Sequence, residues 1–166
     1  MKQVVKEFPR PLIVDRVPAL GIHERIAADE KECTALAKRL GLPRIHALGG
    51  LLKAEPWRGG GLKITGTLNA RVDQVSVISL EPFTSALEFA VERNFLSPRA
   101  GKPGDEEDVD IIENGSVDLG EILAETMALE LDPYPRKAGE AFNDIEEQPE
   151  SAKVSPFTAL SKLRRS

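Results

Sequence analysis

The sequence is poor in the residues that build redox, metal and aromatic sites. Its 166 residues include one cysteine, Cys33, and two histidines, His23 and His46. A single cysteine excludes an internal disulfide and a cysteine-cluster metal site. Aromatic residues make up 5% of the chain and do not cluster with lysine or arginine, which argues against a base-stacking RNA module. We therefore expect neither a metal ion nor another cofactor.

Long apolar runs are also missing. No stretch of about 18 or more apolar residues occurs, so the sequence predicts no membrane-spanning helix. The first residues, MKQVVKEFPRP, lack the apolar segment of a secretory signal. The chain is 41% hydrophobic and 30% charged, which is typical of a globular protein. We expect a cytoplasmic protein with no membrane partner, and we predict no small-molecule substrate.

Charge is divided unevenly along the chain, whose formal net charge is -5. Residues 105–150 hold 16 acidic and 2 basic side chains, whereas the rest of the chain holds 20 basic and 11 acidic ones. An acidic segment suits a basic macromolecule, and a basic N-terminal part and tail suit RNA phosphates. Two solvent-exposed faces with no binding role would have the same division of charge.

Residues 1–135 are predicted to form a single α+β domain that begins with one or two short strands before residue 28. A helix follows, because Asp29 has the position of an N-cap in a capping box and Gly41 that of a helix-ending residue. Cys33 lies on the apolar face of this helix, so we interpret it as a core residue rather than a reactive thiol.

Three further strands are predicted, with short turns between them, over residues 45–57, 62–73 and 87–95. The short turns favour an antiparallel meander. Val75, Val77 and Leu80 break the alternation of apolar and polar residues, which indicates burial on both faces or a bulge. Residues 97–116 are predicted to be a loop whose apolar end pairs briefly with the sheet.

A second helix is predicted to begin after Asp118, where Asp118 and Glu121 repeat the capping-box spacing. Leu129 and Leu131 are expected to widen its apolar surface. The helix is expected to end before Pro133, because a residue that precedes proline avoids helical geometry. Its inward stripe is predicted to contain Leu119, Ile122, Leu123 and Met127.

The remaining residues, 136–166, are predicted to form an acidic, partly mobile loop and a short basic C-terminal segment. Phe157 lies in this last segment and is spaced to dock as a helical turn.

Glu121 and Glu125 are one helical turn apart, which is a possible spacing for acid–base catalysis in a hydrolase. Capping by Glu121 and exposure of Glu125 to water explain the same spacing without chemistry. Gly59-Gly60-Gly61 lacks the lysine of a phosphate loop and is interpreted as a hairpin turn.

Three stretches carry more specific motifs, namely Gly66–Gln74 with Leu80–Phe83, Val117–Glu125 with Ala128–Pro135, and Ser155–Leu163. In these stretches the chain resembles the YceD-like family, also called domain of unknown function 177. The run from Leu131 to Lys137, LDPYPRK, is most similar to the alphaproteobacterial branch. The resemblance covers residues 62–163 best.

The resemblance implies a non-enzymatic bacterial and plastid factor needed for accumulation of 23S ribosomal RNA. We expect the acidic segment, with the helix after Asp118 and the Pro-Tyr-Pro turn, to present a surface to a basic partner, a ribosomal protein or a ribosome-assembly factor, with only an indirect contact to rRNA. The interface residues would be Asp118, Gly120, Glu121, Glu125, Pro133, Tyr134, Pro135 and Phe157. Two alternatives stay open: direct RNA binding through the basic N-terminal part and tail, and a hydrolase using Glu121 and Glu125.

The same motif residues also fit a purely structural role. Asp118 and Glu121 would cap the helix, Gly120 would allow close packing, and Pro133 and Pro135 would fix the direction of the chain.

The chain departs from the family pattern at its cysteines. Many relatives carry C-x-x-C before the Pro-Phe pair and often another cysteine after the Pro-x-Pro. This chain has Ser76 and Ser79 at the first pair, and Arg136 and Lys137 follow its Pro-Tyr-Pro. A zinc ion bound by those cysteines in relatives would lack its ligands here.

Overall fold

The computed structural model describes residues 5–101, 104 and 108–139. Met1–Arg136 forms one compact unit. Its elements are β1 (Pro11–Ile13), β2 (Ile22–Ala27), α1 (Glu30–Leu40), β3 (Arg44–Trp57), β4 (Gly61–Val75), β5 (Pro82–Leu96), β6 (Asp110–Ile111), β7 (Ser116–Asp118) and α2 (Leu119–Glu130), with short 3-10 turns η1 (Val14–Arg16), η2 (Arg58–Gly60) and η3 (Pro98–Ala100).

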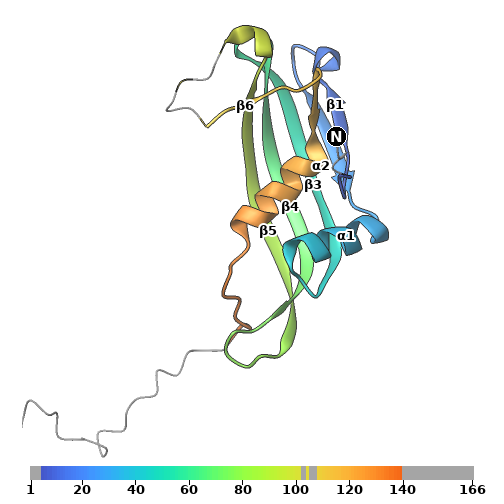
Figure 1. The fold of residues 1–166 in the computed structure, drawn as a ribbon, viewed down its shortest axis with the longest axis vertical. Helices are drawn as coiled ribbons and strands as arrows, with labels where there is room; N and C mark the ends of the chain where they lie inside the picture. Colours follow the sequence, from blue (N-terminus) through green and yellow to red (C-terminus); the bar gives the residue numbers. More distant parts are fainter. Residues whose placement is uncertain (1–4, 102–103, 105–107, 140–166) are drawn as a thin grey trace, which may run out of the picture. The chain divides into compact units, whose positions relative to one another are not determined.

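Five strands form the main sheet in the order β2-β3-β4-β5-β6 (Figure 1). The first four are antiparallel neighbours, and β6 adds to the end of β5 in parallel. The predicted α+β class, the meander and the brief pairing after the loop are therefore confirmed. The predicted early strands are present too, but β1 pairs with β7 in a separate two-stranded sheet.

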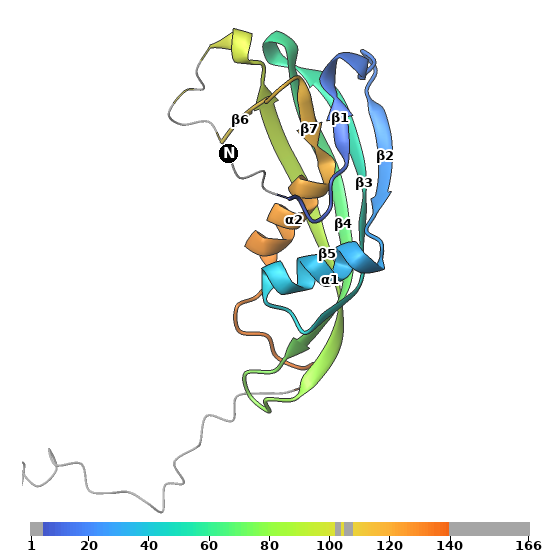
Figure 2. The ribbon, with the colours of Figure 1, turned by 45° about the vertical axis from the view of Figure 1, so that its right-hand side comes forward.

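Both helices and the β1–β7 pair lie against one face of the main sheet (Figure 2). Within the described part of the chain, no helix or strand covers the opposite face, which we call the open face. The alternation in β4 explains this arrangement, because its apolar residues point to the helices and its polar residues to the open face. The buried apolar residues of β4 include Leu62, Ile64, Leu68 and Val72.

Helix α1 begins and ends where the sequence predicts. The Asp29 carboxylate accepts a hydrogen bond from the amide of Glu32, and the Glu32 carboxylate accepts one from the amide of Asp29. Gly41 ends the helix with φ of 68°, a left-handed conformation that glycine adopts without strain. Cys33 is 4% exposed, which confirms its place in the core, and burial raises the pKa of its thiol.

The prediction for residues after Val75 is wrong. Strand β4 ends at Val75, and a turn leads to β5, which begins at Pro82 rather than near residue 87. Leu80 has φ of 59°, and it is exposed together with Val77. The apolar residues that break the alternation thus form a turn that is neither buried nor a bulge within a strand.

Helix α2 packs with the predicted stripe, since Leu119, Ile122, Leu123 and Met127 are all buried. Leu131 is half-buried and packs against the core as predicted, whereas Leu129 does not widen this surface. It is 80% exposed, because its position on the helix turns it away from the sheet. Among the described residues, no helix is long and apolar enough to cross a membrane.

Residues 140–166 lie outside the described residues. They include Phe157 and most of the predicted acidic loop and basic C-terminal segment.

Candidate functional site

Asp118 joins the N-terminal segment to the start of α2. Its carboxylate accepts hydrogen bonds from the amides of Arg10 (2.9 Å) and Glu121 (3.1 Å) and pairs with the ammonium group of Lys6 (3.1 Å). Burial alone would raise the pKa of this carboxyl group, but the two amide hydrogen bonds and Lys6 lower it below its ordinary value. The predicted capping role of Asp118 is confirmed.

Gly120 lies against the backbone of the N-terminal segment. A Cβ atom at this position would be 1.7 Å from the carbonyl oxygen of Phe8, so only glycine fits without a shift of the backbone. The predicted role in close packing is therefore confirmed.

Glu121 does not complete a capping box, and that expectation is wrong. Its carboxylate accepts two hydrogen bonds from the guanidinium group of Arg39 on α1, at 2.7 and 3.2 Å. Arg39 also binds Glu7 at 3.1 Å. The guanidinium group attracts the side chain of Glu121 across to the neighbouring helix, and the bonds with Glu121 raise the pKa of Arg39.

Glu125, one turn later, binds a different arginine. Its carboxylate accepts a hydrogen bond of 2.9 Å from Arg93 of β5, and Arg93 also binds Asp110 of β6. Burial of Arg93 lowers its pKa, but the hydrogen bonds that it donates to Asp110 and Glu125 raise it above its ordinary value. Since Glu121 and Glu125 bind separate arginines, the structure gives the hydrolase alternative no support.

The Pro133-Tyr134-Pro135 segment follows α2 and combines an anchor with an exposed side chain. The carbonyl oxygen of Pro135 accepts a hydrogen bond of 3.0 Å from the amide of Val77, which holds the segment on the turn between β4 and β5. The amide of Tyr134 donates to the Asp132 carboxylate at 2.8 Å, while the Tyr134 side chain is 68% exposed. Among the predicted interface residues described by the structure, Pro133 and Tyr134 are exposed to solvent.

The serines at the family's cysteine positions do not fit a zinc site. Ser76 is fully buried, and its hydroxyl oxygen accepts hydrogen bonds from the amides of Ile78 and Ser79. The hydroxyl oxygen of Ser79 accepts a hydrogen bond of 3.4 Å from the amide of Glu81. Zinc requires thiolate, imidazole or carboxylate ligands, whereas these hydroxyl groups organise the turn between β4 and β5. Among the described residues, no group of three or more potential ligands is close enough together to hold a metal ion.

The structure also brings together acidic residues that the sequence did not identify as a site. They flank the outer edge of β5, and we call them the β5 rim: Glu88, Glu92, Asp108, Asp110, Glu125 and Glu130.

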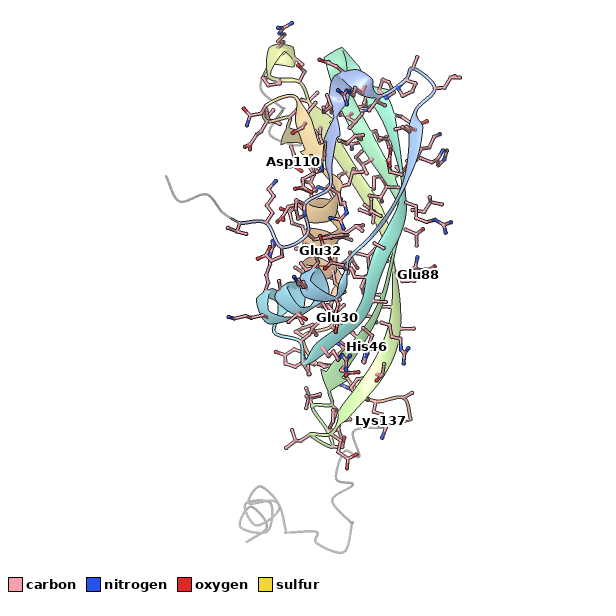
Figure 3. All side chains as sticks on the ribbon, turned by 90° about the vertical axis from the view of Figure 1, so that its right-hand side faces the viewer. Glu30, Glu32, His46, Glu88, Asp110 and Lys137 are labelled. Carbon is pink, nitrogen blue, oxygen red and sulfur yellow. The ribbon has the colours of Figure 1, made fainter. Side chains whose placement is uncertain are left out.

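The side chains of the rim lie on both sides of the sheet. Glu88 and Glu92 alternate with buried or half-buried residues of β5 and point to the open face. Figure 3 shows Glu88 on the side of the sheet away from Glu30 and Glu32. Asp108 and Glu130 line a groove of about 500 Å³ between β5 and α2. The period-two pattern of residues 87–92 placed the glutamates on one strand face, but only the packing of α2 beside β5 makes them part of one rim.

Basic side chains on the open face are partly neutralised within the sheet. Lys53 pairs with Glu55 at 2.5 Å, and Lys63 approaches Glu92 at 3.5 Å. These two pairs neutralise part of the basic charge on the sheet, whereas Arg25 and Arg71 are exposed and form no ion pair with another described residue.

Comparison with known proteins gives one result. A family model described as large ribosomal RNA subunit accumulation protein YceD matches residues 64–164, which is more than half of the chain. No curated protein and no solved structure matches the chain.

Proposed function

Because the chain belongs to the YceD family of large ribosomal RNA subunit accumulation proteins, we propose that it is a non-enzymatic ribosome-biogenesis factor that binds a basic partner protein. The partner would be a ribosomal protein or an assembly factor, and 23S rRNA would be contacted only through it. The binding surface is the β5 rim, and the exposed Tyr134, held near the turn between β4 and β5, is a second candidate contact.

The observation that carries this proposal is the gathering of carboxylates along one edge of the sheet. Glu88, Asp108 and Glu130 form no ion pair with another described residue. Unpaired carboxylates produce a negative potential that attracts a basic protein and repels RNA phosphates. Asp118, Gly120 and Glu121 support the surface from inside the fold.

The proposal is tested by reversing charge on the rim. A variant with Glu88→Lys and Glu130→Lys should fail to restore the ratio of 23S to 16S rRNA in cells that lack the gene. It should also lose the nuclease-resistant partner that the wild-type protein captures from lysate. A matched control with Asp15→Lys and Glu30→Lys has the same change in charge on exposed residues away from the rim.

Two results would contradict the proposal. One is equal rescue by the rim variant and the control variant. The other is release of all captured material by nuclease, together with retardation of bare rRNA fragments that weakens steeply with salt, which is the signature of phosphate binding.

A further inference from the structure

Strand β5 has an outer edge that is unpaired over most of its length. Strand β4 pairs with β5 in unbroken register from Pro82 to Phe95, whereas β6 pairs only with Phe95 and Leu96. Figure 1 shows β5 at the margin of the sheet below the short β6.

The direction of the free backbone groups follows from one hydrogen bond. The amide of Ile112 donates to the carbonyl oxygen of Leu96 at 2.9 Å, so the carbonyl group of Leu96 points away from β4. Backbone groups alternate in direction along a strand, so those of every second residue from Thr84 to Asn94 point to the same outer edge. Among the described residues, β5 pairs only with β4 and, at its end, with β6, so the outward backbone groups from Thr84 to Glu92 face no partner strand.

Acidic side chains lie beside this edge on both faces of the sheet, together with Arg39 and Arg93, which line the groove on the helix face and bind carboxylates there. Glu88 and Glu92 flank it on the open face, and Asp108 and Glu130 flank it on the helix face. Leu129, 80% exposed, lines the groove on the helix face and provides an apolar contact there.

We propose that an extended, lysine- and arginine-rich segment of the partner adds to the edge of β5 as a further strand. This inference rests on the proposed function, which supplies the basic partner. The free backbone groups supply main-chain hydrogen bonds, as in other cases of strand addition. Side chains of an added strand alternate between the two faces, so basic residues meet Glu88 and Glu92 on one face and Asp108 and Glu130 on the other.

The same charges argue against a second copy of this chain as the occupant. Pairing of β5 with β5 of another molecule would place Glu88 and Glu92 among the same glutamates of the second strand. Like charges opposite each other across strands are destabilising. The edge therefore selects a strand of opposite charge.

The experiment measures binding of a synthetic nine-residue peptide, rich in lysine and arginine at both odd and even positions, to the full-length protein by calorimetry. Ala90→Pro removes one outward-facing amide, and proline is tolerated on an edge strand where its nitrogen faces outward. This variant should bind the peptide at least tenfold more weakly, while the matched control Ala90→Ser should bind it normally. The amide protons of Ala86 and Glu88 should exchange more slowly in the wild-type complex.

A second probe does not depend on folding of the variant. The same peptide methylated on the backbone nitrogens that face β5 should lose binding to the wild-type protein. Equal binding of the methylated and unmethylated peptides, or no binding of either at low salt, would overturn strand addition.

The two proposals fail in different ways. If Glu88→Lys with Glu130→Lys abolishes peptide binding but Ala90→Pro and backbone methylation do not, the acidic rim still binds a basic partner and only strand addition is wrong. If the wild-type protein captures no nuclease-resistant partner from lysate, the proposed function itself is wrong.

Discussion

At the scale of single residues, the most family-specific motif of the chain proves to serve its own fold. Asp118 holds the amides of Arg10 and Glu121, and Gly120 lets the N-terminal segment pass at contact distance. Glu121 ties α2 to α1 through Arg39. A short motif of this kind fixes the helices on the sheet, so its residues stabilise the unit that carries the β5 rim.

Gly120→Ala should destabilise the protein by about 2–3 kcal/mol, since overpacking of a tight site typically costs this much. The added Cβ collides with the carbonyl oxygen of Phe8. Urea denaturation measures the change in the free energy of unfolding. Gly104→Ala is the matched control, because nothing lies within 4 Å of a Cβ built at Gly104. Equal stability of the two variants would show that the N-terminal segment does not pack on α2.

At the scale of elements, the turn between β4 and β5 is held by the buried hydroxyl group of Ser76, which accepts hydrogen bonds that a strand or helix would otherwise provide. Ser76 accepts hydrogen bonds from two turn amides, and the amide of Leu80 donates to its carbonyl oxygen. These bonds allow a tight connection between two strands of 15 residues each. The turn in turn supports the segment after α2 through Val77 and Pro135.

Ser76→Ala should cost about 1–2 kcal/mol, because it leaves two turn amides without their buried acceptor. Thermal unfolding measures the loss, and hydrogen exchange should show faster exchange at Ile78 and Ser79. Ser79→Ala removes an exposed hydroxyl group with a single hydrogen bond of 3.4 Å and should change stability far less. A larger loss for Ser79→Ala than for Ser76→Ala would contradict the assigned role.

At the scale of the whole molecule, interactions between distant parts of the sequence hold one side of the sheet closed and leave the other open. Asp118 connects α2 with residues more than a hundred positions earlier, and Arg93 connects β5, β6 and α2. Among the described residues, Glu88, Asp108 and Glu130 of the β5 rim keep carboxylates without an ion pair after these connections. The proposed binding site therefore depends on the complete unit rather than on one segment.

Asp118→Asn should lower stability at pH 7 by about 1 kcal/mol, because an amide retains the cap but loses the charge that the amides and Lys6 stabilise. The folded-state pKa of Asp118 is below its unfolded value of about 3.9, so its contribution is present above that value and is lost as pH falls through the folded pKa. Urea denaturation at pH 7 and at about pH 2 should show the two proteins converging at the lower pH. A difference that persists unchanged at about pH 2, or one that Asp15→Asn also produces, would contradict this linkage.

The sequence by itself determined the local elements. The cap at Asp29, the alternation of β4 and the stripe from Leu119 to Met127 are periodic or adjacent in the chain, and such patterns follow from backbone geometry alone. The capping role of Asp118 and the close packing at Gly120 could also be predicted from the sequence, since both depend on their place at a helix start.

Only the tertiary structure decided which charges meet. Glu121 and Glu125 lie one turn apart on the same helix, yet the Glu121 carboxylate binds Arg39 of α1 and the Glu125 carboxylate binds Arg93 of β5. Long-range pairing of this kind depends on which helices pack side by side and has no signature in sequence order. For the same reason the β5 rim, built from a strand, a loop and a helix, emerges only when the sheet and α2 lie together.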